Sequence, residues 1–365
     1  MGQVWVTIFL VTIFHSFSIY LSPIILPLLS FRVEPESVNP DSDLYRAHPE
    51  WAVEVPGKPG VLMRDQLLLD LANVDVQNHL IEVFTKLFAS ANISYVKWDH
   101  NRFISNPYSR SLPADRQAEF SHRYMLGLYN IVKTVTESFP HILFEGCAGG
   151  GGRFDPAMLA YMPQSWGSDN TDTEERVKIQ WGYSYAYPLS MVGAHVSTVP
   201  NQQVERVTAW ESRASVAHFG TFGYELNMME LSEDEKQQAA VDSNAHKAIR
   251  HLVHHGDWYR MRSPYKSNWP GWMCVSSDPG ASEAIVFGYQ RLRHSREIVP
   301  AFILKGLDEK KEYIVFQIPN PKQKRRFSGD ELMTRGLTIP FSHDFEGHLY
   351  YVCEVDHYTK VIATF

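Results

Sequence analysis

Short apolar runs alternate with amphipathic stretches from about residue 31 to residue 255 of the chain. The runs predict strands, and the stretches between them carry apolar residues at helical spacing. Strands are expected at 31–35, 67–72, 93–98, 141–146, 164–168, 190–197 and 222–229. Helices are expected at about 73–91, 114–138, 173–186, 203–219 and 232–255. Apolar strands separated by helices indicate a parallel sheet that is covered on both faces.

Polar residues at the carboxyl ends of these runs help to choose between a doubly wound sheet and a (β/α)8 barrel. Asp70, Asp99, Glu145 and Asp169 each lie at or just after the end of an apolar run. A barrel brings the carboxyl ends of all its strands to one rim, where barrel enzymes carry their chemistry. A doubly wound sheet usually has a glycine-rich turn after its first strand, and this sequence has none there. We therefore expect an incomplete TIM-type (β/α)8 barrel at residues 31–255, lacking its first strand because seven strands are one short of closure.

The pattern changes at about residue 256. From residue 256 to residue 365, short apolar strands separated by proline, glycine and aspartate replace the helices. Such spacing is typical of antiparallel sheets, in which turns rather than helices connect the strands. The sequence therefore predicts a second domain, a C-terminal antiparallel β-sandwich at residues 256–365.

Residues 1–30 contain no Lys, Arg, Asp or Glu. Their length suits a membrane anchor or a signal-like segment, although a basic start is lacking and Pro23 and Pro27 interrupt the apolar run. The segment is also rich in β-branched and aromatic residues, which favour a strand. Three interpretations stay open: an anchor that contacts a membrane, a non-native sequence joined at a truncation point, and a surrogate strand.

Composition and charge narrow the function classes. The chain has 44% hydrophobic residues, 21% charged residues and a net charge of −7, which argues against a surface for nucleic acid. The cysteines are too few and too scattered for a metal cage or a disulfide framework; they are Cys147, Cys274 and Cys353. Their odd number favours a reducing compartment such as the cytoplasm, whereas a genuine anchor or signal at residues 1–30 would place the protein at a membrane or outside the cell. The localisation therefore stays open.

Two acidic motifs are candidates for carboxyl catalysis, Lys-Trp-Asp-His-Asn-Arg around Asp99 and Trp-Gly-Ser-Asp-Asn-Thr-Asp around Asp169. Lys97 precedes Asp99 by two positions on the same face of a strand, and a nearby ammonium favours the ionised carboxylate. Asp169 follows Trp166, and burial beside an aromatic wall would raise its pKa towards that of a general acid. The structural alternative makes Asp99, Asp169 and Asp172 into helix-capping or turn residues.

A glycine run, Cys-Ala-Gly-Gly-Gly-Gly-Arg-Phe-Asp, follows the predicted strand at 141–146. It lacks the Gly-Lys-Ser/Thr ending of a phosphate-binding loop, so that interpretation is disfavoured. Glycines let the backbone approach a ligand closely and present N–H groups to it. Such a loop suits a ligand with many hydroxyl groups, such as a sugar.

These three motifs, in this order, resemble those of α-galactosidases of glycoside hydrolase family 36. The segments FRVEPESVNPDSDLYRAHPEW, HRYMLGLY, MVGAHVSTVPN and GTFGYEL are also similar, so the resemblance runs from about Phe31 into the C-terminal domain. It implies a retaining, double-displacement hydrolase of terminal α-galactose, with melibiose and raffinose-type oligosaccharides as substrates. It further implies that no metal or organic cofactor is required, and that the full-length family forms homo-oligomers.

By matching position, the resemblance makes Asp99 the nucleophile at the end of barrel strand 4 and Asp169 the acid/base at the end of strand 6. It assigns substrate contacts to Arg64, Lys97, Asn101, Cys147, Gly149 and Trp166. The first three would bind galactose hydroxyls, Cys147 and Gly149 would lie under the sugar, and the tryptophan would form a pocket wall. One small departure is His100, where the family often has Met; its side chain is expected to point away from Asp99 and to have little effect.

Two family features are absent from this sequence. Family members carry an Asp-Asp-Gly-Trp motif that grips two galactose hydroxyls, and no Asp-Asp-Gly occurs here. The large β-sandwich domain that normally precedes the barrel is missing as well. We therefore expect an N-terminally truncated enzyme with open sheet edges and weakened sugar binding. Two alternatives to hydrolysis remain, which are raffinose synthase-like α-galactosyl transfer and an inactive fragment, anchored to a membrane if residues 1–30 are an anchor.

Overall fold

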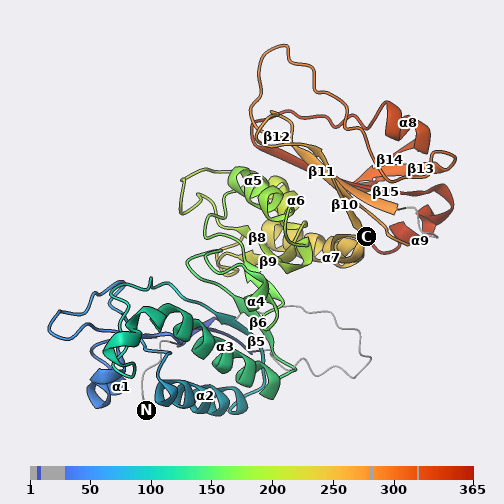
Figure 1. Cartoon of the computed structure of the whole chain (residues 1–365). Coiled ribbons are helices and arrows are strands. Elements are labelled where there is room, and N and C mark those ends of the chain that lie inside the picture. Colours follow the sequence, from blue (N-terminus) through green and yellow to red (C-terminus); the bar gives the residue numbers. More distant parts are fainter. Residues whose placement is uncertain (1–5, 10–28, 279–282, 319) are drawn as a thin grey trace. The chain divides into compact units, whose positions relative to one another are not determined.

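The computed structural model describes residues 6–9, 29–278, 283–318 and 320–365. Contacts divide the chain into two compact units, Met1–Asp169 and Asn170–Phe365, which we call the N-terminal and the C-terminal unit. Figure 1 shows the N-terminal unit in blue to green and the C-terminal unit in green to red. The domain boundary predicted at residue 256 falls inside the C-terminal unit.

A parallel sheet forms the centre of the N-terminal unit (Figure 1). Its strands, in spatial order, are β2 (Leu29–Val33), β5 (Ile93–Trp98), β6 (Leu143–Gly146) and β7 (Gln164–Trp166). The helices between them include α2 (Val74–Ala89) and α3 (Phe120–Ser138). Shorter helices are α1 (Asp43–Ala47), η1 (Pro49–Trp51), η2 (Ala114–Glu119) and α4 (Pro156–Leu159).

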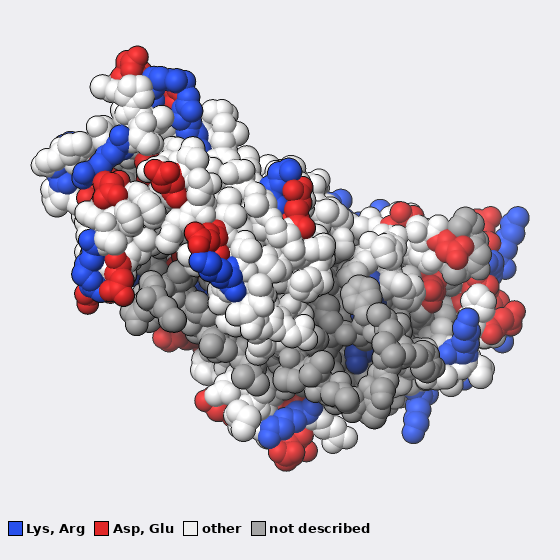
Figure 2. Space-filling view, turned by 90° about the horizontal axis from the view of Figure 1, so that it is seen from below, with Lys and Arg blue, Asp and Glu red and all other residues white. Residues whose placement is uncertain are grey.

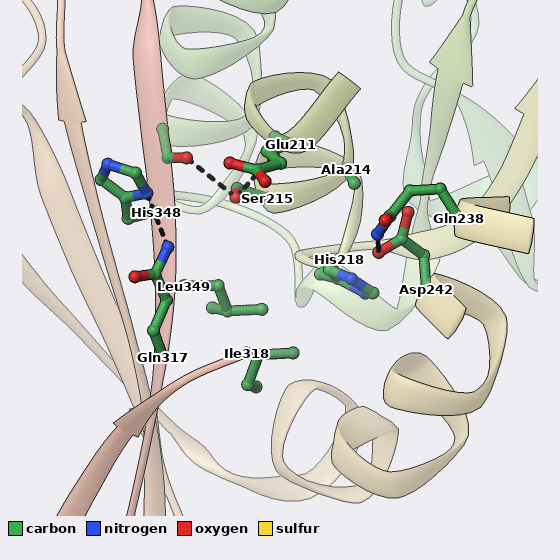
Figure 3. A pocket seen from close by; sticks show the side chains of 11 residues that line it. Glu211, Ala214, Ser215, His218, Gln238, Asp242, Gln317, Ile318, His348 and Leu349 are labelled. Atoms are coloured by element: carbon green, nitrogen blue, oxygen red, sulfur yellow. Dashed lines mark hydrogen bonds between the residues drawn. The ribbon is translucent and has the colours of Figure 1, made fainter. Parts of the chain in front are cut away.

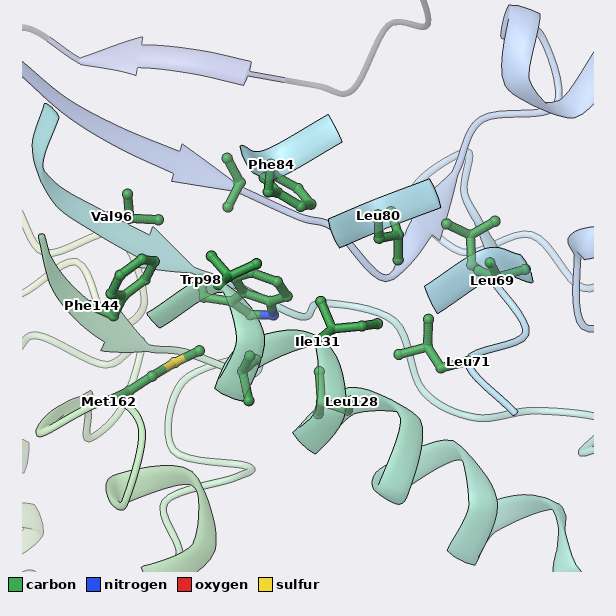
Figure 4. Packing of buried hydrophobic residues seen from close by; sticks show 14 of the residues in the cluster. Leu69, Leu71, Leu80, Phe84, Val96, Trp98, Leu128, Ile131, Phe144 and Met162 are labelled. Atoms are coloured by element: carbon green, nitrogen blue, oxygen red, sulfur yellow. The ribbon is translucent and has the colours of Figure 1, made fainter. Parts of the chain in front are cut away.

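One face of this sheet packs against α2 and α3. Figure 4 shows Val96, Trp98 and Phe144 of the strands in the same apolar cluster as side chains of both helices. On α2 the buried apolar residues recur every four positions, at Val76, Leu80, Phe84 and Phe88, which gives the helix one continuous apolar stripe. Alternate strand residues point the other way, so the opposite face of the sheet is free to carry polar side chains.

The predicted strand at 67–72 does not join the parallel sheet. Its first residues, β4 (Leu67–Leu68), pair antiparallel with β3 (Ser37–Val38) in a separate two-stranded sheet, and β2 pairs directly with β5. An apolar run suits any buried strand, and here the partner is the segment that directly follows β2. The expected count of seven barrel strands is therefore wrong, because the described residues form six parallel strands.

Residues Val6–Phe9 form strand β1, which pairs antiparallel with β2. These four residues form a strand, whereas residues 1–5 and 10–28 lie outside the described part of the chain, so the three interpretations of residues 1–30 stay predictions. The edge of β2, which was expected to be open, is covered by this pairing. No helix among the described residues is long and apolar enough to cross a membrane.

The C-terminal unit begins with the remaining parallel strands, β8 (Val192–Ser197) and β9 (Thr221–Glu225), which pair with each other. Its helices are α5 (Thr173–Tyr183), η3 (Leu189–Met191), α6 (Trp210–Ala217), α7 (Glu233–His255), α8 (Gly329–Thr334), η4 (Val355–His357) and α9 (Tyr358–Ile362). The long helix α7 opens with a capping box, in which Ser232 and Glu235 satisfy each other's backbone N–H groups.

An antiparallel sheet completes the C-terminal unit. Its strands, in spatial order, are β10 (Asp257–Arg262), β11 (Gly271–Val275), β12 (Glu283–Gln290), β15 (Glu346–Glu354), β13 (Glu312–Gln317) and β14 (Asn320–Ser328). The predicted antiparallel arrangement is confirmed, but the described strands form one sheet rather than two facing ones. One face packs on helix residues such as Leu252 of α7, and irregular segments that contain Phe302 and Ile339 cover the other.

The surface contributes less to stability than these apolar clusters. Figure 2 shows basic and acidic side chains intermingled on one face of the molecule. Exposed ion pairs such as Arg116–Glu119 and Lys133–Glu137 are separated by 2.7 Å and 3.0 Å. Pairs of this kind typically contribute about 0–1 kcal/mol each, because water screens them.

We predict that Gly127→Ala destabilises the N-terminal unit by about 3 kcal/mol, because a Cβ at Gly127 of α3 would lie 1.9 Å from the carbonyl oxygen of Leu71. The matched control is Gly182→Ala in α5, where an added Cβ meets nothing within 4 Å. That change should stabilise its helix by up to about 1 kcal/mol, since alanine is the better helix former. Urea denaturation followed by circular dichroism measures both; equal effects of the two substitutions would contradict the packing described here.

Candidate active site

The polar face of the parallel sheet in the N-terminal unit holds two rows of side chains that strand register brings together. The lower row consists of Arg32, Lys97, Glu145 and Gln164, which lie opposite one another in the pairing of β2, β5, β6 and β7. The residues two positions further along point to the same face and form the upper row, which consists of Glu34, Asp99, Cys147 and Trp166. Several predicted site residues therefore share one face of the sheet, at the carboxyl ends of its strands.

Asp99 directly follows β5 and is 1% exposed. Its Oδ1 accepts a hydrogen bond from the backbone N–H of His100 at 2.8 Å. Its Oδ2 accepts from the guanidinium of Arg32 at 2.5 Å. The side chains of Asn101 and Cys147 lie close enough to this carboxylate to favour its ionised form. The carboxylate is thus held from several sides, as a group with a fixed position requires.

The surroundings of Asp99 favour its ionised form. Burial alone would raise the pKa of Asp99, but the positive charge of Arg32 opposes this effect. The hydrogen bonds from Asn101 and Cys147 and the charge of Lys97 act in the same direction as Arg32, so the pKa lies below its ordinary value. The predicted influence of Lys97 on Asp99 is present, and it is weaker than that of Arg32.

Lys97 is held in the lower row by a buried acceptor. Its Nζ lies 2.9 Å from Oε1 of Glu145 and 4.4 Å from the ring centre of Trp166. The other oxygen of Glu145 accepts hydrogen bonds from the hydroxyl of Tyr95 and from Nε2 of Gln164. These contacts fix the ammonium beneath the upper row and against the tryptophan.

A glycine loop, residues 147–153, lies against both acidic motifs. At one end, the backbone carbonyl of Cys147 accepts a hydrogen bond from the N–H of His100 at 3.0 Å, and burial raises the pKa of the Cys147 thiol. Further along, Gly150 has a φ of +86°, and a Cβ at this position would lie 2.9 Å from the backbone nitrogen of Asp169. Only glycine combines this backbone conformation with so close an approach. The loop thereby links Asp99 and Asp169, which lie seventy residues apart in the sequence.

The side chain of Asp169 is exposed. The expectation that it is buried beside Trp166 is therefore wrong: β7 ends at Trp166, which is 1% exposed, and the chain then leaves the sheet. Gly149, in the glycine loop, also faces open space, because a Cβ added there would meet no atom within 4 Å. The outer side of the site is thus accessible and its inner side is packed.

Arg64 lies at the tip of a turn, with its side chain exposed. Arg64 and Asp65 both have a positive φ, and backbone hydrogen bonds between Met63 and Gln66 close the turn. The turn approaches the upper row through Gln66, whose side-chain amide donates to Glu34 at 3.3 Å. The sugar contact assigned to Arg64 stays a prediction.

Sequence reasoning missed two residues of this face, Arg32 and Glu34. Oε1 of Glu34 accepts hydrogen bonds from Nδ2 of Asn101 at 2.9 Å and from Arg32 at 3.3 Å. A signal was present in the segment FRVEPE, where the charged residues alternate with Phe31 and Val33. That period of two places the charged side chains on the face opposite the apolar core.

Glu36 is a second buried carboxylate beside the site, and it is 1% exposed. Arg153 donates to both of its oxygens, at 2.7 and 3.0 Å. The hydroxyl of Tyr124 donates at 2.8 Å, and Nε1 of Trp98 at 3.2 Å. His100, which was expected to have little effect, belongs to this cluster, since its Nδ1 lies 3.6 Å from Glu36.

The cluster around Glu36 ties together the two segments that carry the site. Trp98 directly precedes Asp99, and Arg153 ends the glycine loop. Burial would raise the pKa of Glu36, but the charges of Arg153 and His100 and the hydrogen bonds outweigh it and lower the pKa to about 2. Glu36 is therefore ionised wherever the protein is folded at ordinary pH.

Two further acidic residues serve structural roles. Asp172 is the N-cap of α5, where it accepts from the backbone N–H of Glu175 at 3.1 Å, and it also pairs with Arg206. Asp70 is buried and accepts from the hydroxyl of Ser109 at 2.5 Å. The capping alternative considered for Asp172 is thus confirmed.

A small pocket in the C-terminal unit contains none of the predicted residues (Figure 3). Its polar lining includes Glu211, His218, Gln238, Asp242, Gln317 and His348. Burial lowers the pKa of His218 to about 3, so this ring is neutral. The space of about 20 Å³ accommodates about one water molecule and no sugar.

Among the described residues, no three His, Cys, Asp or Glu side chains are grouped as metal ligands would be.

Two family models match the chain. The Melibiase model matches residues 28–256, and the model of the glycosyl hydrolase family 36 C-terminal domain matches residues 269–352. The first includes both rows of the polar face, the glycine loop and Asp169. The second falls within the antiparallel sheet.

Similar curated proteins are α-galactosidases. Alpha-galactosidase AgaA of Geobacillus stearothermophilus is 48% identical over 314 residues, which cover 86% of this chain and 42% of that protein. Alpha-galactosidase 1 of Pediococcus pentosaceus is 44% identical, with coverages of 84% and 41%. The chain thus spans about two fifths of the length of these relatives.

Similar solved structures support the same fold. A variant of AgaA from G. stearothermophilus in complex with raffinose has a TM-score of 0.85 and 46% identity, over 89% of this chain and 44% of that one. The galactosidase domain of AgaSK, an α-galactosidase–sucrose kinase, has a TM-score of 0.81 and 37% identity, over 89% and 43%. The predicted fold class is confirmed: a partial TIM barrel, with six parallel strands among the described residues, is followed by an antiparallel sheet.

We predict that Glu36→Gln destabilises the N-terminal unit by about 3 kcal/mol near neutral pH, because it leaves Arg153 without its buried counter-charge. The pKa of Glu36 is lowered from 4.5 to about 2 on folding, so its contribution is fully present above about pH 4.5. The contribution is lost as the pH falls towards 2. The stability difference between wild type and variant should shrink over that range in urea denaturation.

Glu137→Gln is the matched control, since Glu137 is exposed on α3 and pairs only with Lys133 among the interactions described. It should change the unfolding free energy by less than about 0.5 kcal/mol. A difference for Glu36→Gln that grows on acidification would contradict the ionised state assigned to Glu36.

Proposed function

This chain belongs to the α-galactosidases of glycosyl hydrolase family 36, and on that premise we propose that its N-terminal unit binds terminal α-galactose and hydrolyses its glycosidic bond. We assign Asp99 as the nucleophile and Asp169 as the general acid and base. The substrates proposed are melibiose and oligosaccharides of the raffinose type. Solved relatives were obtained in complex with raffinose and with stachyose, which are sugars of this type.

The observation that carries the proposal is the state of Asp99. It is a buried carboxylate with a lowered pKa, at the carboxyl end of a parallel strand. A glycosidase nucleophile must be ionised and held in one orientation, and the contacts of Asp99 meet both requirements. A carboxyl group that only capped a helix would not need a lysine and an arginine on the same face of the sheet.

The reaction would proceed in two steps with net retention. In the first, an oxygen of Asp99 forms a bond to the anomeric carbon while the bond from that carbon to the leaving oxygen breaks, and Asp169 gives its proton to that oxygen. In the second, Asp169 takes a proton from water, whose oxygen bonds to the anomeric carbon and displaces Asp99. The exposed carboxyl group of Asp169 is accessible both to a leaving group and to water.

The remaining site residues are proposed to hold the sugar. Lys97 and Asn101 flank the nucleophile and offer donors to galactose hydroxyls, and Arg64 would add a donor from its turn. Trp166 would form one wall, with Cys147 beneath the sugar. The open space at Gly149 leaves room for a ring next to the backbone of the glycine loop.

We predict that Asp99→Ala lowers the hydrolysis of an aryl α-galactoside by the full chain at least about a thousandfold, because no other group forms the covalent intermediate.

Asp169→Ala should lower kcat strongly for a poor leaving group such as a sugar. It should retain the first step for dinitrophenyl α-galactoside, which leaves without a proton. Added azide should then restore turnover with the dinitrophenyl substrate by attacking the intermediate in place of water.

Asp115→Ala is the matched control, because Asp115 is an exposed aspartate of η2. It should change activity less than about twofold, as expected for a surface residue that makes none of the contacts of the site. The proposal is wrong if the full chain has no α-galactosidase activity, or if Asp99→Ala hydrolyses the substrate as fast as wild type.

A further inference from the structure

The guanidinium of Arg32 contacts two carboxylates of the site with one nitrogen. Its Nη2 lies 2.5 Å from Oδ2 of Asp99 and 3.3 Å from Oε1 of Glu34. The side chain of Arg32 is 34% exposed, whereas that of Asp99 is 2% exposed. The arginine is therefore the more exposed partner of this pair.

The oxygen of Asp99 that Arg32 contacts is the one that no backbone donor holds. Oδ1 of Asp99 accepts from the backbone N–H of His100, and a backbone donor of the adjacent residue cannot turn away. Asn101, three residues after β5, and Cys147 of the glycine loop also favour the ionised carboxylate. Of these donors, only Arg32 is a long side chain that is partly exposed and carries a full charge.

We propose that Arg32 is a cap on Asp99, which covers Oδ2 in the resting site and must turn away before this oxygen can react. Arg32 would affect the reaction only by controlling access to Asp99. It is therefore a positioning residue and not a catalytic one. The contact between Arg32 and Asp99 does not depend on what the protein does. The claim that Arg32 must turn away before Asp99 reacts rests on the proposed function.

Glu34 provides a place for the displaced guanidinium. It already contacts Arg32, and its own position is fixed by Asn101 at 2.9 Å and by Gln66 at 3.3 Å. Nε of Arg32 is buried and has no hydrogen-bond partner among the described residues, so the resting pose leaves one of its donors unsatisfied. A rotation towards Glu34 keeps a carboxylate within reach while it frees Asp99.

The other charged groups around Asp99 are poorly placed to take over the cap. Lys97 is engaged with Glu145 at 2.9 Å in the lower row. His100 points towards Glu36, with 3.6 Å between Nδ1 and the carboxylate, and burial lowers its pKa. Removal of Arg32 should therefore expose Oδ2 rather than exchange one cation for another.

Carbodiimide labelling of carboxyl groups tests the cap without any sugar. The full chain is treated with a water-soluble carbodiimide and an amine at pH 5 to 7, and labelling of Asp99 is measured by peptide mass spectrometry. We expect Asp99 to be labelled at least about tenfold faster in Arg32→Ala than in wild type, because both steric access and protonation increase. Arg32→Lys should fall between the two, since it keeps the charge but not the planar fork.

Arg116→Ala is the matched control, because Arg116 is an exposed arginine whose described ion pair is with Glu119. It should leave the labelling of Asp99 unchanged. Asp70, which is buried elsewhere in the same unit, reports general loosening and should stay equally protected in all variants. The cap is disproved if Asp99 is labelled equally in wild type and Arg32→Ala, or if Asp70 becomes labelled along with it.

Covalent trapping connects the cap to catalysis. With 2-deoxy-2-fluoro-α-galactosyl fluoride, Asp99 should be trapped faster in Arg32→Ala than in wild type, as read by intact mass. Slower trapping in that variant would overturn the catalytic meaning of the cap. Absence of α-galactosidase activity in every variant, together with the expected carbodiimide result, would disprove the proposed function and leave the cap in place.

Discussion

The alternation of side chains along three neighbouring parallel strands determines both the core and the site of this protein. On β2, β5 and β6, one set of positions is apolar and packs on α2 and α3, and the intervening set is charged or polar. Because the strands are in register, the polar positions align into rows across the sheet. A shift of one residue in any of these strands would move its charged side chains into the apolar core and its apolar ones into the site.

The charged face is tolerated because nearly every cation on it has a carboxylate within contact distance. Lys97 pairs with Glu145, Arg32 with Asp99 and Glu34, and Arg153 with Glu36. Buried charges are expensive unless they are paired and hydrogen-bonded, so the face persists only as a set of pairs. This requirement explains why Glu36 and Glu145 are needed beside Asp99, and why Asp99 can remain ionised in a packed environment.

The local parts of this arrangement could be predicted from the sequence, and the non-local parts could not. Lys97 and Asp99 are two positions apart, so their shared face follows from the strand period alone. The contact of Arg32 with Asp99 joins residues that are 67 positions apart, and it depends on which strand lies beside β5. The apolar run at 67–72 was assigned to the barrel because its pattern does not specify a partner. The burial expected for Asp169 failed for a similar reason, since the end of β7 sets its exposure.

The cluster around Glu36 also constrains how this sequence can change over time. Three side chains from separate segments donate to one carboxylate, so the effect of a substitution at Tyr124, Trp98 or Arg153 depends on what occupies the other two positions. Coupling between residues that share such a network typically amounts to about 0.5–3 kcal/mol. These positions are therefore expected to evolve together, and a change tolerated in one homologue can be harmful in another whose remaining partners differ.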